Sequence, residues 1–179
     1  HDMIAIVAAM AEEVHALLEW MEAPVARRRD EIDFWEGLIK GQAVVLMRSG
    51  VGKVNAAMSA TLLMKHYHPD ALINIGTAGG LCEDEQVLDL VIGKAMVQYD
   101  YDTSYLDGKE GIGLHFMADE ALCRLCETIC DAMQERYHSG LIASGDQFVG
   151  REDQIHSLLE RFPNAKCAEM ESGAIAQIC

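Results

Sequence analysis

Residues 168–176 read Ala-Glu-Met-Glu-Ser-Gly-Ala-Ile-Ala, and this stretch predicts the end of a strand followed by the start of a helix. The strand pattern covers residues 166–169, Glu171 lies on the connection, and a run of small residues follows. In open α/β sheets, ligands bind where strands end and helices begin. A carboxylate at that place can hold the hydroxyls of a sugar or assist a proton transfer, so Glu171 is a candidate site residue.

The rest of the chain alternates between apolar strand patterns and helical patterns. This order predicts an α/β protein with three α/β/α layers around a central mixed sheet. We find no linker, so residues 1–179 are expected to form a single domain. A polar segment at 27–30 and a long loop at 98–117 interrupt the pattern. Strands are expected at 3–8, 32–38, 43–47, 71–75, 88–97, 140–144 and 166–169, and helices at about 11–21, 53–66, 119–137 and 152–161.

The composition excludes several classes of partner. With 14 Lys and Arg against 29 Asp and Glu, the chain has a net charge of −15, which argues against nucleic acid and anionic membranes as partners. No apolar run has the length of a transmembrane helix, and the start of the chain lacks a signal-peptide pattern. The 6 cysteines show no paired framework, so we expect a reduced, cytoplasmic protein.

Two glycine-containing loops follow expected strands. Gly50-Val51-Gly52-Lys53 is not a phosphate-binding loop, because that motif needs Gly at position 47 and Ser or Thr at position 54, where this chain has Met47 and Val54. It predicts either a tight strand-to-helix turn or a backbone that approaches a ligand. The segment 76–80, Gly-Thr-Ala-Gly-Gly, leaves a plain turn and a ligand contact equally open.

Cys123, Cys126 and Cys130 recur at helical spacing beside apolar residues. We interpret them as core packing rather than as metal ligands, since free Cys behaves as a small hydrophobe. No histidine lies in a motif that would orient it for catalysis.

Glu12 and Glu13 alone would be ordinary acids in the first turn of a helix. They belong, however, to one of five motifs that occur in a particular order along residues 3–179. Together these motifs closely resemble the 5′-methylthioadenosine/S-adenosylhomocysteine nucleosidases of the nucleoside phosphorylase/hydrolase superfamily. The motifs are Met-Ala-Glu-Glu-Val at 10–14, Ser-Gly-Val-Gly-Lys-Val-Asn-Ala-Ala at 49–57, Asn-Ile-Gly-Thr-Ala-Gly-Gly at 74–80, Ser-Gly-Asp-Gln-Phe at 144–148 and Glu-Met-Glu at 169–171.

The resemblance implies hydrolysis of the N-glycosidic bond of an adenine thionucleoside, which releases adenine and a 5-thioribose product in methionine salvage. It implies no metal and no cofactor. Glu13 matches the water-activating glutamate, with Glu12 as second choice, and Glu171 matches the glutamate that binds the ribose. The expected substrate-binding residues are Met10, Val51, Thr77, Gly79, Phe148, which stacks on adenine, Val149, whose backbone reads the base, and Met170 beside the sugar.

The resemblance also implies an aspartate, in a later Ser-Asp motif, that protonates the departing adenine. Residues 1–179 contain no such motif, and we expect a further strand and helix to accompany it. A chain of these residues alone is therefore expected to have severely reduced activity. The family further implies a homodimer in which a partner residue closes the alkylthio pocket. Tyr105, in the loop 98–105, is a candidate for that residue, although a solvated acidic loop explains the segment equally well.

Three alternatives remain. A nucleoside phosphorylase needs basic groups around phosphate, for which Arg48 is the nearest candidate. A nucleosidase for futalosine-type substrates is the second. The third is a nucleoside-binding module without catalysis.

Overall fold

The computed structural model describes residues 2–179, which fold into two compact units. The first unit contains the residues up to Thr77 together with Ile178–Cys179, and the second contains Ala78–Gln177. Each unit is described by itself. The expectation of a single domain stays a prediction.

The first unit is built on a mixed five-stranded sheet. Its order is β2-β3-β4-β1-β5, in which β1 lies parallel to β4 and β5 while β2, β3 and β4 are antiparallel. The strands are β1 (Ile4–Ala8), β2 (Glu22–Arg29), β3 (Ile32–Ile39), β4 (Gln42–Arg48) and β5 (Ala71–Asn74), and the helices are α1 (Ala11–Leu18) and α2 (Lys53–Tyr67).

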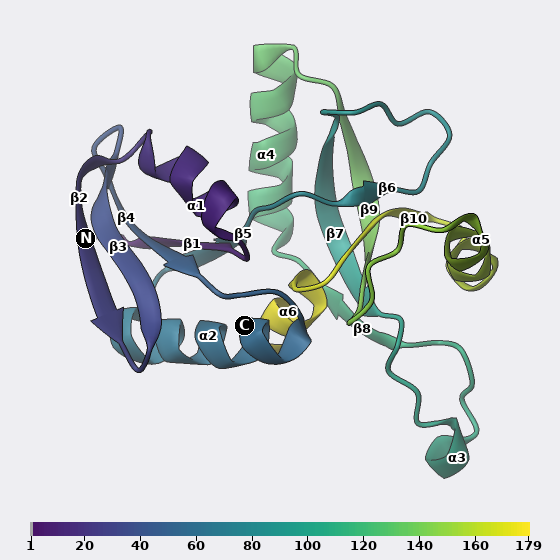
Figure 1. The fold of residues 1–179 in the computed structure, drawn as a ribbon. Helices are drawn as coiled ribbons and strands as arrows, with labels where there is room; N and C mark the ends of the chain where they lie inside the picture. The colour runs from purple at the N-terminus through teal and green to yellow at the C-terminus, as the bar shows by residue number, and fades with distance from the viewer. Residues whose placement is uncertain (1) are drawn as a thin grey trace. The chain divides into compact units, whose positions relative to one another are not determined.

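Helices cover both faces of this sheet, because alternate residues of a strand point to opposite faces. Val44 and Leu46 of β4 pack with Val14 of α1. Met47 faces the other way with its register partner Phe34, whose ring contacts Tyr67 of α2. Figure 1 shows α1 and α2 on opposite sides of the sheet.

Two expectations for this unit are corrected. The polar segment 27–30 is mostly strand, since β2 runs through Arg29. It is an edge strand in which arginines pair with acids of β3, such as Arg28 with Asp33 at 2.8 Å, and such edges carry charge to avoid further pairing. The strand at 71–75 was expected to be buried, but Ile73 is 37% exposed because β5 is the other edge of the sheet.

The second unit has its own mixed five-stranded sheet, in the order β6-β10-β9-β7-β8. β7, β9 and β10 are parallel, whereas β6 and β8 are antiparallel to their neighbours. The strands are β6 (Gly79–Gly80), β7 (Leu90–Gln98), β8 (Leu114–Met117), β9 (Tyr137–Ser144) and β10 (Ala165–Glu169), and the helices are α3 (Ser104–Asp107), α4 (Glu120–Met133), α5 (Glu152–Arg161) and α6 (Ser172–Ile178).

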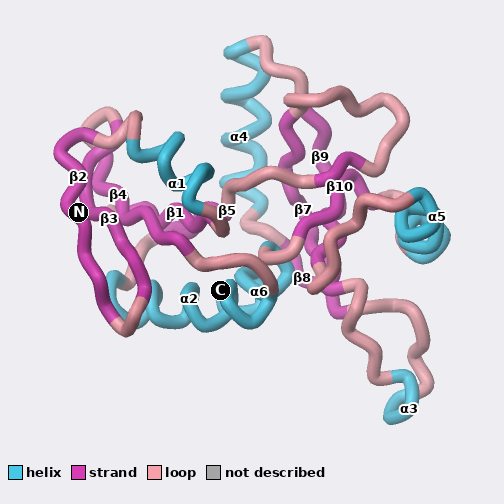
Figure 2. The backbone as a smooth tube through the Cα atoms, in the orientation of Figure 1, coloured by secondary structure: helices cyan, strands magenta, loops and turns pink. Residues whose placement is uncertain are grey.

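This sheet is also covered on both faces. Leu158 and Phe162, from α5 and its end, pack on Val97 and Ala143 of the sheet, and Figure 1 shows α4 on the side opposite α5. The prediction of a long loop over residues 98–117 is wrong in part. Figure 2 shows that β8 and α3 interrupt it.

The α/β class with helix, sheet and helix layers is confirmed. The strands form two mixed sheets, one in each unit, where the sequence suggested one central sheet. No helix among residues 2–179 is long and apolar enough to cross a membrane.

Candidate active site

Three loops of the first unit meet where the parallel strands β1, β4 and β5 end. The amide of Ser49 donates to the carbonyl of Ala8 at 2.9 Å, and the amide of Ile75 donates to that of Val7 at 3.0 Å. The loops after these strands are therefore held along one edge of the sheet, which is where α/β proteins bind ligands.

The Glu13 carboxylate lies at this edge and accepts four hydrogen bonds. Its Oε2 accepts hydrogen bonds from the amides of Ala9 at 3.0 Å and Met10 at 3.1 Å. Its Oε1 accepts from the amide of Thr77 at 3.0 Å and from the Thr77 hydroxyl at 3.3 Å. The half-buried Glu13 is thus fixed by two loops, while its neighbour Glu12 is exposed. These hydrogen bonds distinguish Glu13 from Glu12, which the family resemblance left as second choice.

Gly76 leaves the space that this carboxylate occupies. A Cβ on Gly76 would lie 2.9 Å from Glu13 Oε1, which is closer than real Cβ contacts come. Part of the Gly-rich segment after β5 is therefore required by the position of Glu13. Sequence reasoning missed this role of Gly76, because no local pattern connects residues 13 and 76.

Two other predicted site residues, Met10 and Val51, lie in the loops at this edge. Met10 is 37% exposed and Val51 is 46% exposed. Val51 lies between Gly50 and Gly52, whose φ angles are +82° and +95°. The tight strand-to-helix turn predicted here is confirmed, since such angles favour glycine.

In the second unit, Glu169 and Glu171 lie at the turn from β10 into α6. Glu169 Oε2 accepts from the amides of Glu171 at 2.9 Å and Ser172 at 2.8 Å, and its Oε1 accepts from the Ser172 hydroxyl at 2.6 Å. Glu171 and Met170 are half-buried. The predicted strand-to-helix junction is confirmed, and the Glu169 carboxylate is hydrogen-bonded within it.

Gly79 and Val149 are neighbours in the second unit. Gly79 pairs with Ala168 as β6 adds to β10, and a Cβ on Gly79 would lie 3.5 Å from the carbonyl oxygen of Val149. Phe148, expected to stack on adenine, is 83% exposed. An aromatic ring at this level of exposure has its face available to a ligand.

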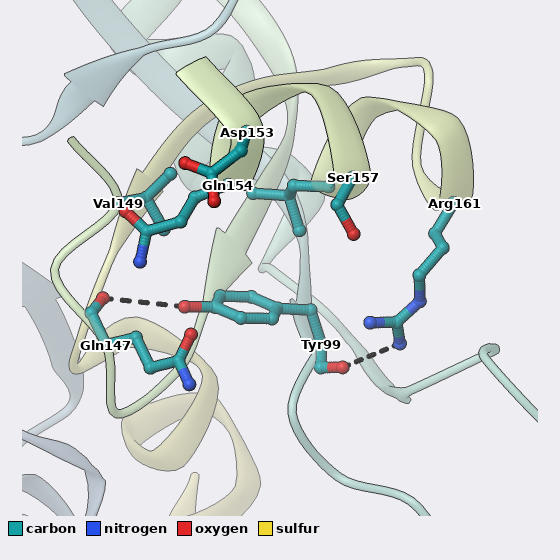
Figure 3. A pocket seen from close by; sticks show the side chains of 8 residues that line it. Tyr99, Gln147, Val149, Asp153, Gln154, Ser157 and Arg161 are labelled. Carbon is teal, nitrogen blue, oxygen red and sulfur yellow. Dashed lines mark hydrogen bonds between the residues drawn. The ribbon is translucent and has the colours of Figure 1, made fainter. Parts of the chain in front are cut away.

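A cavity of about 250 Å³ is lined by Tyr99, by Gln147 and Val149 of the loop after β9, and by residues of α5. Figure 3 shows Tyr99 among the side chains that line the cavity. The Tyr99 hydroxyl donates to the carbonyl of Gln147 at 3.4 Å. Arg161 donates to the Tyr99 carbonyl at 2.7 Å. A Cβ on Gly145 would lie 2.5 Å from Tyr99 Cζ. Of the predicted site residues only Val149 lines this cavity.

The Tyr99 side chain is buried and lies near three carboxylates. Burial, followed by the charges of Asp100, Asp146 and Glu169, raises the pKa of Tyr99 to about 12. The phenol therefore stays protonated near neutral pH and remains a hydrogen-bond donor.

Two further candidates lie in different surroundings. Tyr105 is in α3 with its side chain fully exposed. Arg48 donates to Asp33 at 2.8 Å, so its guanidinium is engaged with β3.

Two of the three cysteines of α4, Cys123 and Cys130, are buried as expected, whereas Cys126 is half-buried. Cys123 is 7% and Cys130 is 8% exposed, and burial raises the pKa of both thiols. Within residues 2–179, no three His, Cys, Asp or Glu side chains gather as ligands for a metal ion.

Residues 3–179 match the sequence model of the phosphorylase superfamily. A 5′-methylthioadenosine/S-adenosylhomocysteine nucleosidase of Bacillus cereus is 38% identical over 98% of this chain and 78% of that protein. The chain belongs to the 5′-methylthioadenosine/S-adenosylhomocysteine nucleosidase family. Its membership accounts for the five motifs and their order.

Solved structures agree with this family. The nucleosidase of Neisseria meningitidis, solved in complex with methylthio-immucillin-A, has a TM-score of 0.94 at 32% identity and covers 100% of this chain and 80% of its own. A futalosine hydrolase mutant of Helicobacter pylori has a TM-score of 0.90 at 27% identity, covering 100% and 83%. The α/β fold of the nucleosidase family is thus shared with an enzyme named for another nucleoside.

Proposed function

We propose that this chain hydrolyses the N-glycosidic bond of 5′-methylthioadenosine and of S-adenosylhomocysteine, releasing adenine and a 5-thioribose product. The observation that carries the proposal is the Glu13 carboxylate, which Ala9, Met10 and Thr77 hold at the carboxyl edge of the first sheet. A carboxylate in a fixed position can accept a proton from water as that water attacks the anomeric carbon.

Glu171 is proposed to bind the ribose hydroxyls. Cleavage of a nucleoside develops positive charge on the sugar as the base leaves, and a carboxylate stabilises such an oxocarbenium-like state. Met170 lies beside the sugar, Phe148 offers its ring face to adenine, and the backbone of Val149 reads the base. Met10, Val51, Thr77 and Gly79 line the substrate in this proposal.

Hydrolysis is favoured over phosphorolysis by the surroundings of Arg48. This side chain was the nearest candidate for binding phosphate, but it donates to Asp33. A futalosine-type substrate remains the second candidate because a futalosine hydrolase shares the fold.

The decisive experiment uses two substrates that differ in their leaving group. Adenine release from 5′-methylthioadenosine is measured with and without phosphate, beside release of 4-nitrophenolate from 4-nitrophenyl 5-methylthioriboside. Because 4-nitrophenolate leaves without being protonated, its release tests Glu13 and Glu171 apart from any acid that acts on adenine. Futalosine is measured in parallel.

We expect phosphate-independent cleavage and a loss in kcat of about 10²–10⁴-fold for Glu13→Gln. Glu12→Gln is the matched control and should retain activity, since its side chain is exposed. Phosphate-dependent cleavage would show a phosphorylase, preference for futalosine would show the second candidate, and binding of the thionucleoside without cleavage of either substrate would show a binding module.

A homodimer in the cytoplasm is part of the proposal. The six cysteines are free thiols, which suits a reducing compartment, and the family resemblance supports a dimer in which Tyr105 of one copy closes the alkylthio pocket of the other. Light scattering of the purified chain and the Tyr105→Ala variant, assayed against substrates with different 5′ substituents, test these two points.

A further inference from the structure

The Glu169 carboxylate of the Glu169-Met170-Glu171 motif is hydrogen-bonded to the turn that follows it. Both oxygens of Glu169 are occupied inside the turn: Oε2 accepts two backbone amides, of Glu171 and Ser172, and Oε1 accepts the Ser172 hydroxyl at 2.6 Å. Hydrogen bonds to an ionised acceptor are stronger than those between neutral groups. Glu169 therefore holds the backbone of the residue two positions beyond it.

Gly173, the next residue of the turn, is held by hydrogen bonds from the sheet. The amide of Gly173 donates to the hydroxyl of Ser144 at 3.0 Å, and Gln98 Nε2 donates to the carbonyl of Gly173 at 3.1 Å. Gln98 also donates to Gln177 at 2.8 Å. The start of α6 is thus tied to β9 through Ser144 and to β7 through Gln98.

The packing around Gly173 leaves no space for a side chain. A Cβ on Gly173 would lie 2.7 Å from Gln98 Cγ and 2.9 Å from Ser144 Cβ. Ser144 is fully buried and Gln98 is 5% exposed. With Gly173 held against these side chains and Glu169 bonded to the two preceding amides, the backbone of Glu171 is restrained on both sides.

We infer that Glu169 is a positioning residue, which fixes the Glu171–Ser172 backbone so that the Glu171 carboxylate is directed at the ribose hydroxyls. The inference rests on the proposed function of Glu171. It assigns the two acids separate tasks, since the donors of the turn use both oxygens of Glu169, while the proposed function gives the ribose hydroxyls to Glu171. A displacement of about 1 Å in a substrate-binding group can cost about 100-fold in rate.

Two substitutions of Glu169 separate positioning from direct contact with the substrate. In Glu169→Gln the amide oxygen can still accept from both backbone amides, while the amide nitrogen donates to the Ser172 hydroxyl. In Glu169→Ala these donors lose their acceptor. We expect Glu169→Ala to lower kcat/KM by about 100-fold and Glu169→Gln to restore most of it. Glu160→Ala, on the exposed part of α5, is the control and should match the unchanged chain.

Amide hydrogen exchange supplies a second readout that needs no turnover. In Glu169→Ala the amides of Glu171 and Ser172 should exchange faster, while that of Ala168, within the β10 ladders, stays protected. Unchanged protection of Glu171 and Ser172 would overturn the inference.

The kinetic outcomes distinguish this inference from the proposed function. If Glu171→Gln leaves cleavage intact, the proposed function of Glu171 fails, and the exchange data still decide whether Glu169 holds the turn. If Glu171→Gln abolishes cleavage but Glu169→Ala does not slow it, the positioning role is wrong. It is also wrong if Glu169→Gln is as slow as Glu169→Ala, because a negative charge on Glu169 would then act on the substrate directly.

Discussion

At the residue scale, the positions of two carboxylates depend on backbone amides. Glu13 accepts from Ala9, Met10 and Thr77, and Glu169 accepts from Glu171 and Ser172. Neutral donors orient a carboxylate without placing a cation beside it. Such an arrangement suits a base that has to receive a proton from water.

Gly76→Ala should reduce activity with little change in folding. The added Cβ would lie 2.9 Å from Glu13 Oε1, and the end of this flexible side chain can move away more easily than the backbone can. We expect kcat to fall by about 100-fold, because the displaced carboxylate of Glu13, the proposed base, is no longer oriented toward the attacking water. The melting temperature should stay nearly unchanged.

Gly140→Ala is the matched control for this prediction. Its Cβ would lie 3.1 Å from Lys166 Cγ, a slightly less crowded contact with another flexible side chain, away from both carboxylates. Assays of 4-nitrophenolate release and thermal unfolding of both variants check the prediction. Equal activity of the two variants would show that Gly76 has no connection with the function of Glu13.

At the element scale, the helix start at Asp119 was visible in the sequence. Asp119 is the first residue of the helix expected at 119–137, and its Oδ1 accepts from the amide of Leu122 at 2.9 Å at the start of α4. A capping side chain satisfies one of the amides that have no partner within the first turn.

Asp119→Ala should lower the free energy of unfolding by about 1 kcal/mol, the typical loss when such a cap is removed. Asp119→Ser should lose much less, because its hydroxyl can accept the same hydrogen bond. Urea unfolding of the two variants at one pH measures both values. A serine variant as unstable as the alanine variant would show that the hydrogen bond is not the cause.

The elements that local patterns missed are those stabilised by partners distant in sequence. The residues of β8 were placed in a long loop, but Leu114–Met117 pairs with β7 across register partners such as Phe116 and Met96. β2 carries three successive arginines and no alternation of apolar residues, and it is a strand because β3 provides its hydrogen bonds and its acidic partners.

At the scale of the whole molecule, acid stability should depend on Asp89. This carboxylate accepts from the amide of Gln86 at 2.9 Å and from Arg136 and His138 at 2.8 Å each. Burial acts to raise the pKa of Asp89, but these three hydrogen bonds outweigh it and lower the pKa to about 2. They tie the connection between β6 and β7 to the region where β9 begins.

Because the pKa of Asp89 is lower in the folded chain than its usual value, its contribution to stability is present above about pH 4 and is lost as the pH falls toward 2. Asp89→Asn should therefore be less stable than the unchanged chain at pH 7, and this difference should shrink across that window. Urea unfolding at several pH values measures it. Asp153→Asn is the control, since its pair with Arg151 is exposed on both sides and should contribute little. A difference that does not change with pH would contradict the prediction.

The sequence by itself determined the α/β class, most strands and helices, the two turns that require glycine or a capping acid, and the family. These features rest on local periodicity and on short motifs, which are readable along the chain. The bonds of Gly173 with Gln98 and Ser144, the contact of Gly76 with Glu13, and the division of the strands into two sheets were decided only by the tertiary structure. Residues 13 and 77 meet because parallel strands of the first unit end at one edge of its sheet. Residues 98, 144 and 173 meet because β7, β9 and α6 converge within the second unit. Hydrogen bonds between groups so distant in sequence leave no periodic pattern, so only the folded chain reveals them.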